Sequence, residues 1–167
     1  MRIAFYEPDQ LETVVDLFHE MSVHYNGLNA SARSVVKHNL VENILADHSS
    51  VRLVIAAERD RAVALAAIAV LYPAARERGQ LFMKEIFVSS SHRGCGIGTS
   101  LMRFVAKHAI ANNCIRLDWT VDRDNERALD FYRRVGARPA ADKIYFRVSG
   151  EDLVRFAAAE SDNSNVG

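Results

Sequence analysis

Three glycines fall within five positions of the segment "HRGCGIGTS" (92–100), which separates an apolar run at 80–89 from a run with helical spacing. Glycine loses the most backbone freedom on folding, so such a cluster is expected where the chain turns tightly or approaches a ligand closely. A helix N-terminus presents unpaired N–H groups and a partial positive charge. The segment therefore predicts a phosphate site at 93–99; the alternative is a tight turn alone.

Two common phosphate loops do not match this segment. A Walker loop needs a lysine and a hydroxyl residue after its last glycine, and Thr99 follows Gly98 directly. A dinucleotide fingerprint needs GxGxxG in the first βα unit, whereas here the spacing is GxGxG and the loop lies in the middle of the chain. The phosphate belongs to some other type of ligand.

Composition narrows the class of protein. The chain has 167 residues, with 21 Lys plus Arg balanced by 21 Asp plus Glu. We expect one domain over 1–159, a disordered tail at 160–167, and no nucleic-acid or membrane partner, because no net charge attracts either polyanion. The longest apolar run, 62–71, is about half of a membrane span. With only two cysteines and no export signal at the start, a cytoplasmic protein is expected.

The periodicity of apolar residues predicts an α/β protein with a mixed sheet and helices on its faces. The expected order is β-α-α-β-β-β-α-β-α-β, followed by a short terminal helix that begins near Ser149. The expected strands are 2–7, 51–57, 62–71, 80–89, 114–121 and 143–148. The expected helices are 9–25, 31–46, 97–111 and 125–137, the last ending with a left-handed cap at Gly136.

Two segments together resemble the GNAT N-acetyltransferases. "HRGCGIG" fits the signature Arg/Gln-x-x-Gly-x-Gly/Ala through Arg93, Gly96 and Gly98, and "NERALDFYRRVGA" (125–137) is similar to the second conserved block of that family. The resemblance covers 80–148 closely and the whole chain in element order. It is nearest to small diamine and polyamine acetyltransferases and their bacterial relatives, and it implies the GNAT acyl-CoA N-acyltransferase fold.

The resemblance implies that acetyl-CoA is the co-substrate. Its pyrophosphate would lie on the loop amides, its pantetheine arm would run beside the strand 80–89, and Asn125 would bind the pantetheine or cap its own helix. The implied cofactor-binding residues are Ile86, Phe87, Val88, Arg93, Gly94, Cys95, Gly96, Ile97, Gly98, Thr99 and Asn125.

Two catalytic residues follow from the same resemblance. Tyr132 matches the family tyrosine that acts as general acid at the CoA sulfur; the alternative is a packing role beside Phe131. Glu85 is the candidate base that removes a proton from the amine, directly or through water; the alternative is a surface strand residue paired with Lys84 or a neighbour. The polyamine enzymes have Leu-Glu-Asp where this chain has Met83-Lys84-Glu85, which weakens the expectation of a strongly cationic substrate.

The acceptor is expected to be a small-molecule primary amine, bound near Tyr25, Asn26 and Trp119. The alternatives are a protein or peptide amine, or a non-catalytic acyl-CoA binding module. No metal is expected, because His19 and His24 are five residues apart and would face about 140° apart on a helix. The resemblance also implies a homodimer.

Overall fold

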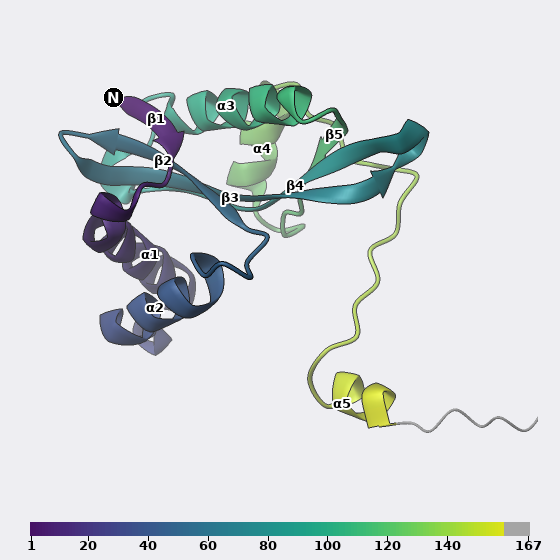
Figure 1. Cartoon of the computed structure of the whole chain (residues 1–167), viewed down its shortest axis with the longest axis horizontal. Helices are drawn as coiled ribbons and strands as arrows, with labels where there is room; N and C mark the ends of the chain where they lie inside the picture. The colour runs from purple at the N-terminus through teal and green to yellow at the C-terminus, as the bar shows by residue number, and fades with distance from the viewer. Residues whose placement is uncertain (159–167) are drawn as a thin grey trace, which may run out of the picture. The chain divides into compact units, whose positions relative to one another are not determined.

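Five strands form one sheet in chain order in the computed structural model, which describes residues 1–158 (Figure 1). The first four strands pair antiparallel, and β5 pairs parallel to β4. The strands are β1 (Arg2–Phe5), β2 (Arg52–Glu58), β3 (Arg61–Ala74), β4 (Arg78–Val88) and β5 (Cys114–Asp118). The mixed sheet predicted from the sequence is confirmed.

Contacts divide the chain into two units, Met1–Glu126 and Arg127 onward. In the first unit, α1 and α2 lie on one face of the sheet and α3 lies on the other (Figure 1). The helices of this unit are α1 (Leu11–Asn26), α2 (Arg33–Asn39), which continues as a π-helical turn over Leu40–Ile44, and α3 (Ile97–Ala111). The expectation of one domain over 1–159 stays a prediction.

The hairpin formed by β2 and β3 is buried on both faces. Val54, Ala64 and Ala66 have no exposed surface, and neither does Leu65, which points the other way. This burial explains why their sequences are continuous apolar runs rather than alternating ones. The core on the α1 side consists of Val14, Val15, Leu17, Phe18, Leu40, Leu53, Ile55, Ala62, Leu65, Ala67 and Phe87.

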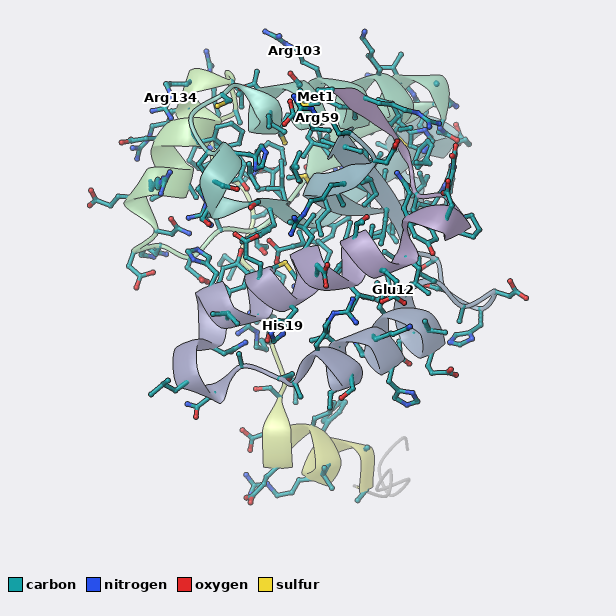
Figure 2. All side chains as sticks on the ribbon, turned by 90° about the vertical axis from the view of Figure 1, so that its left-hand side faces the viewer. Met1, Glu12, His19, Arg59, Arg103 and Arg134 are labelled. Atoms are coloured by element: carbon teal, nitrogen blue, oxygen red, sulfur yellow. The ribbon has the colours of Figure 1, made fainter. Side chains whose placement is uncertain are left out.

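Ion pairs join α1 to α2 on the solvent side of this core. Glu12 accepts hydrogen bonds from Arg33 (2.8 Å) and Lys37, and Arg33 Nε also donates to Asp16 (2.7 Å). Figure 2 shows Glu12 between the two helices. These exposed ion pairs connect α2 to α1, the helix that carries Tyr25.

The second unit contains α4 (Glu126–Arg134, which begins at the last residue of the first unit) and α5 (Gly150–Ala158). Gly136 has φ of +87°; its N–H bonds to the Arg133 carbonyl and that of Ala137 to the Tyr132 carbonyl. This is the Schellman geometry, so the left-handed cap predicted at Gly136 is confirmed. The tail predicted at 160–167 lies outside the described residues.

The strand predicted at 143–148 is absent from the structure. These residues pair with no strand among residues 1–158, and Ile144 and Phe146 are 81% and 86% exposed. The prediction rested on the β-branched and aromatic residues of "KIYFRV". Such residues are common in strands because their side chains pack well on a half-buried, pleated surface. A strand exists through its inter-strand hydrogen bonds, and local composition does not supply the partner.

Candidate active site

The glycine loop joins the end of β4 to the start of α3, as predicted. Gly94 and Gly96 have φ of +82° and +76°, a region that side chains with a Cβ atom rarely adopt. A Cβ atom built on either glycine would meet nothing within 4 Å. The glycines are therefore required by the backbone conformation, and the outer side of the loop is open to a ligand.

The first turn of α3 faces this open loop. Its N-cap residue, Gly96, brings no side chain to bond the amides of Ile97, Gly98 and Thr99. The Ile97 side chain is 5% exposed and anchors the turn in the core, while the Gly96 carbonyl accepts the Ser100 amide at 3.1 Å. Amides at a helix N-terminus without a side-chain cap are suited to an anion.

Arg93 is directed back onto the end of β4. Its Nε donates to the Val88 carbonyl at 3.0 Å, and its guanidinium carbon is 5.5 Å from the centroid of the Phe87 ring. Cys95 is exposed, and its Sγ contacts the Arg93 carbonyl at 3.8 Å. The arginine therefore links the loop to the strand beside it.

The pairing of β4 with β5 covers only the first part of β4. It runs from Gly79 opposite Cys114 to Phe82 opposite Asp118. From Met83 to Val88, β4 pairs with β3 on one edge and with no described strand on the other. Side chains already bond two main-chain groups of this segment: the Ile86 amide donates to Glu85 Oε1, and the Val88 carbonyl accepts from Arg93 Nε. The remaining groups of this edge have no strand partner among residues 1–158, and the pantetheine arm beside Ile86, Phe87 and Val88 stays a prediction.

A β-bulge lies where this open edge begins. Ile68 of β3 is opposite Met83, and the preceding residue, Ala67, is opposite Glu85, so Lys84 is an additional residue on β4. Ala67 belongs to the core on the α1 side, and directly opposed residues share a face of a sheet. The bulge therefore places Glu85 on the face covered by α1. Bulges commonly redirect a side chain in this way.

Glu85 meets Tyr25 on that face. The Tyr25 hydroxyl, from the last turn of α1, donates to Glu85 Oε1 at 3.0 Å, and the Ile86 amide donates to the same oxygen at 3.1 Å. Burial raises the pKa of Glu85 above its ordinary value, although these two hydrogen bonds and the Lys84 charge act in the opposite direction. Glu85 is half-buried, and the role of base and the alternative of a strand residue paired with a neighbour both stay predictions.

Aromatic rings surround the Tyr25–Glu85 contact. The Tyr25 ring centroid is 5.2 Å from that of His24 and 6.4 Å from that of Phe87, which is 3% exposed. Of the other two predicted substrate residues, Asn26 donates to the Ser22 carbonyl of its own helix at 3.0 Å, and Trp119 follows β5 and is half-buried. The structure brings Tyr25 to Glu85, and the substrate contacts of all three residues stay predictions.

Asn125 precedes α4, and Tyr132 lies on that helix. The exposed Asn125 immediately precedes α4, and its amide bonds to the Asp122 carbonyl at 3.0 Å. Tyr132 lies on α4 in the second unit, where its ring centroid is 5.2 Å from that of Phe131. This contact agrees with the packing alternative, and the role of general acid stays a prediction.

Glu20 is a residue at this site that the sequence reasoning missed. Its Oε1 accepts the Ser90 amide at 2.7 Å, so α1 holds the segment between β4 and the glycine loop. A pocket of about 280 Å³ adjoins this bond; its lining includes Asp16, Glu20, Arg61, Ser90 and His92. The spacing of apolar residues in α1 identifies the buried face of the helix. No sequence pattern indicates which loop a polar residue beside that face, such as Glu20, will contact.

Two further observations concern the described residues alone. Residues 1–158 contain no group of three or more His, Cys, Asp or Glu side chains that could hold a metal ion. Within the same range, every helix is too short or too polar to cross a membrane.

Comparison with known proteins identifies the family. The model of the Acetyltransferase (GNAT) family matches residues 14–137, so the chain belongs to this family. A solved structure, an integron cassette protein from the mobile metagenome of V. cholerae, is 35% identical with a TM-score of 0.90, covering 95% of this chain and 98% of its own. The predicted family and fold are confirmed.

Curated relatives match shorter stretches. The thialysine N-epsilon-acetyltransferase of Bos taurus is 31% identical over 80 residues, which cover 46% of this chain and 47% of the relative. The L-ornithine N5-acetyltransferase of Arabidopsis thaliana is 29% identical over 82 residues, 49% of this chain and 36% of the relative. The matched region thus spans about half the length of these relatives or less.

Proposed function

We propose that this protein is an acetyl-CoA-dependent N-acetyltransferase that moves an acetyl group directly to a primary amine of a small molecule. The observation that supports this most directly is the half-buried Glu85 carboxylate beside the open edge of β4. A carboxylate with a raised pKa is a better base near neutral pH than an ordinary surface acid. It lies next to the segment of main chain that an extended ligand would use.

The residues present fit acetyl-CoA. The open conformations at Gly94 and Gly96 and the uncapped amides of α3 suit a pyrophosphate, with many acceptor oxygens for backbone donors. The edge at Ile86, Phe87 and Val88 has no strand partner among residues 1–158, and its main-chain groups other than the Ile86 amide and the Val88 carbonyl suit the amide groups of a pantetheine arm. When bound, acetyl-CoA supplies an acetyl group activated as a thioester.

The reaction requires proton transfers at the amine and at the departing sulfur. An alkylamine has a pKa of about 10.4 and must lose a proton before its lone pair can attack. Glu85 accepts the first proton from the ammonium nitrogen and passes it to solvent. The new C–N bond then forms, the C–S bond breaks, and the nitrogen releases its second proton to solvent. Tyr132 is our candidate to protonate the departing thiolate, and its phenol regains a proton from solvent.

The two curated relatives support a small amine as acceptor, because thialysine and ornithine both carry a primary amine on a short chain. A peptide amine is the second candidate acceptor, and binding of acyl-CoA without catalysis is the candidate outside the enzyme class. The homodimer and the cytoplasmic location expected from the sequence stay predictions.

Release of free thiol from acetyl-CoA tests the proposal. Thialysine, L-ornithine, polyamines, aminoglycosides and peptides with a free N-terminus would be compared, and product identity confirmed by mass spectrometry. We expect thiol release to rise with at least one small amine. Glu85→Gln should lower kcat with that amine by about 10²–10⁴-fold, since general-base catalysis contributes that much.

Glu42→Gln is the matched control, because Glu42 is an exposed glutamate on the π-helical turn after α2 and makes no hydrogen bond or ion pair among residues 1–158. It should retain the wild-type rate. Calorimetric titration with CoA separates binding from chemistry, and Glu85→Gln should bind CoA as the wild type does. CoA binding without turnover on any amine would favour the binding module, and turnover confined to peptides would favour the second acceptor class.

A further inference from the structure

The two oxygens of the Glu85 carboxylate have different environments. Oε1 accepts two hydrogen bonds, from the Tyr25 hydroxyl at 3.0 Å and the Ile86 amide at 3.1 Å. Among residues 1–158, no donor bonds Oε2. The carboxylate is therefore held through one oxygen, and the other is available to accept a proton.

Packing alone does not explain the position of Tyr25. Its side chain is 56% exposed, yet its hydroxyl contacts a residue 60 positions away. The helix ends one residue later: Gly27, the C-cap, has φ of +54° and turns the chain away from the α1 axis. Tyr25 thus occupies the last full turn of α1, where its ring reaches over Phe87 toward the strand that carries Glu85.

We propose that Tyr25 is a positioning residue for the base. Its hydroxyl, together with the Ile86 amide, fixes Oε1 so that Oε2 of Glu85 is the oxygen that takes the proton of the acceptor amine. In that step the N–H bond breaks, the electron pair stays on nitrogen, and an O–H bond forms at Oε2; the proton passes to water after each turnover. The inference rests on the proposed function and gives Tyr25 a role in addition to the substrate contact expected from the sequence.

The surroundings of Glu85 determine what removal of the Tyr25 hydroxyl should do. Lys84 on its own strand is the charge that acts on the carboxylate. His24 on α1 and Arg93 on the loop contact the ring of Phe87, two residues along β4. Burial raises the pKa of Glu85, and the Tyr25 hydrogen bond is the largest of the opposing effects. Without the hydroxyl, the pKa should rise further.

The experiment compares Tyr25→Phe with Tyr72→Phe. Tyr72 is also exposed and also donates its hydroxyl in a hydrogen bond, to the Asn112 carbonyl at 3.1 Å. It lies beside Gly79 near the start of β4, whereas Glu85 lies toward the end of that strand. Each variant would be assayed with L-ornithine and thialysine over pH 5–10. Tyr25→Phe should lower kcat by about 10- to 100-fold, the loss expected for one hydrogen bond to a charged group. KM for the amine should stay unchanged, and the acid limb of the pH profile should move to higher pH.

A second readout needs no turnover. Carbon-13 NMR of glutamate-labelled protein follows the Glu85 carboxyl through its titration, with Glu85→Gln assigning the signal. Tyr25→Phe should raise the pKa of that signal, and Tyr72→Phe should leave it in place. An unchanged titration in Tyr25→Phe would overturn the inference even in the absence of a known acceptor.

Three outcomes separate this inference from the proposed function. If Glu85→Gln loses activity and Tyr25→Phe raises only KM, the base assignment stands and Tyr25 is a substrate contact. If Tyr25→Phe still lowers kcat in the Glu85→Gln background, Tyr25 acts independently of Glu85 and the inference is wrong. If the double variant equals Glu85→Gln alone, Tyr25 acts through Glu85 as proposed.

Discussion

Ala67 of β3 lies opposite Glu85 of β4, although the next residue of β3 lies opposite Met83, so Lys84 has no partner across the strands. Without this bulge, regular alternation would place Met83 and Glu85 on the same face of the sheet. With it, Met83 is buried and Glu85 turns to the face of α1. The pairing of β4 with β5 ends at Phe82, just before the bulge.

Deletion of Lys84 should lower activity without preventing folding. A regular strand without Lys84 would still place Met83 and Glu85 on opposite faces, so we expect a folded protein whose circular dichroism resembles the wild type. The local bend would be lost, and β5 could then extend its pairing along β4. We expect turnover to fall by about 10²-fold or more, since misplacement by about 1 Å can cost that much.

Lys84→Ala is the control for the deletion, because it keeps the bulge and removes only an exposed side chain. It should retain turnover within a few-fold. Since the Lys84 charge lowers the pKa of Glu85, the acid limb of the pH profile should move slightly upward. Full activity in the deletion variant would show that the bulge is not needed.

Gly96→Ala should weaken both folding and CoA binding. Its φ of +76° costs a residue with a Cβ atom about 1–2 kcal/mol, although no neighbouring atom obstructs the Cβ itself. Gly136→Ala is matched, since φ there is +87° and space is also open. Both variants should lose about 1–2 kcal/mol in urea unfolding, and calorimetry should show weaker CoA binding only for Gly96→Ala. Equal CoA affinities would contradict the loop assignment.

Features that depend on neighbouring residues were the ones that the sequence predicted well. The glycines at 94 and 96 and the cap at Gly136 each follow from the φ that one position requires. The order of helices and strands through β5 follows from apolar spacing and turn residues. The position of the glycine loop between β4 and α3 was predicted because a strand, a glycine cluster and a helix are consecutive in the chain, and its phosphate site stays a prediction.

Features that depend on partners distant in sequence could not be predicted in this way. The run at 143–148 has strand composition, but pairing is decided elsewhere in the fold. The bulge at Lys84 leaves no trace in "LFMKEIFV", because either register satisfies its apolar residues. Tyr25 and Glu85 were each predicted as site residues, but nothing in either segment predicts that their side chains meet.

Gly79 and Tyr72 should show coupled stability effects at the distal end of the β3–β4 hairpin. A Cβ atom on Gly79 would lie 2.9 Å from Tyr72 Cζ and 3.2 Å from Cys114 Sγ. Gly79→Ala must therefore displace the Tyr72 ring and weaken its bond to the Asn112 carbonyl, at a cost of about 1–3 kcal/mol. In a Tyr72→Ala background the cost should fall by about 0.5 kcal/mol or more. Additive unfolding energies would contradict this contact.

The hydrogen bond from the Ser90 amide to Glu20 should make the free energy of unfolding depend on pH. Burial pushes the pKa of Glu20 upward, but hydrogen bonds from that amide and from the Ser89 and Ser90 hydroxyls, with the charge of Arg93, leave it below the ordinary value. A carboxylate with a lowered pKa stabilises the fold above its unfolded pKa and loses this contribution as pH falls through its folded pKa.

We therefore expect Glu20→Gln to be less stable than the wild type by about 0.5–1 kcal/mol at pH 7, a modest value because the group is partly solvated. The difference should shrink as pH falls from the ordinary glutamate pKa of about 4.3 through the lower pKa of the folded state. Urea unfolding from pH 3 to 7 measures it, with Glu42→Gln as the exposed control. A difference that stays constant down to pH 3 would mean that Glu20 acts through packing rather than through its charge.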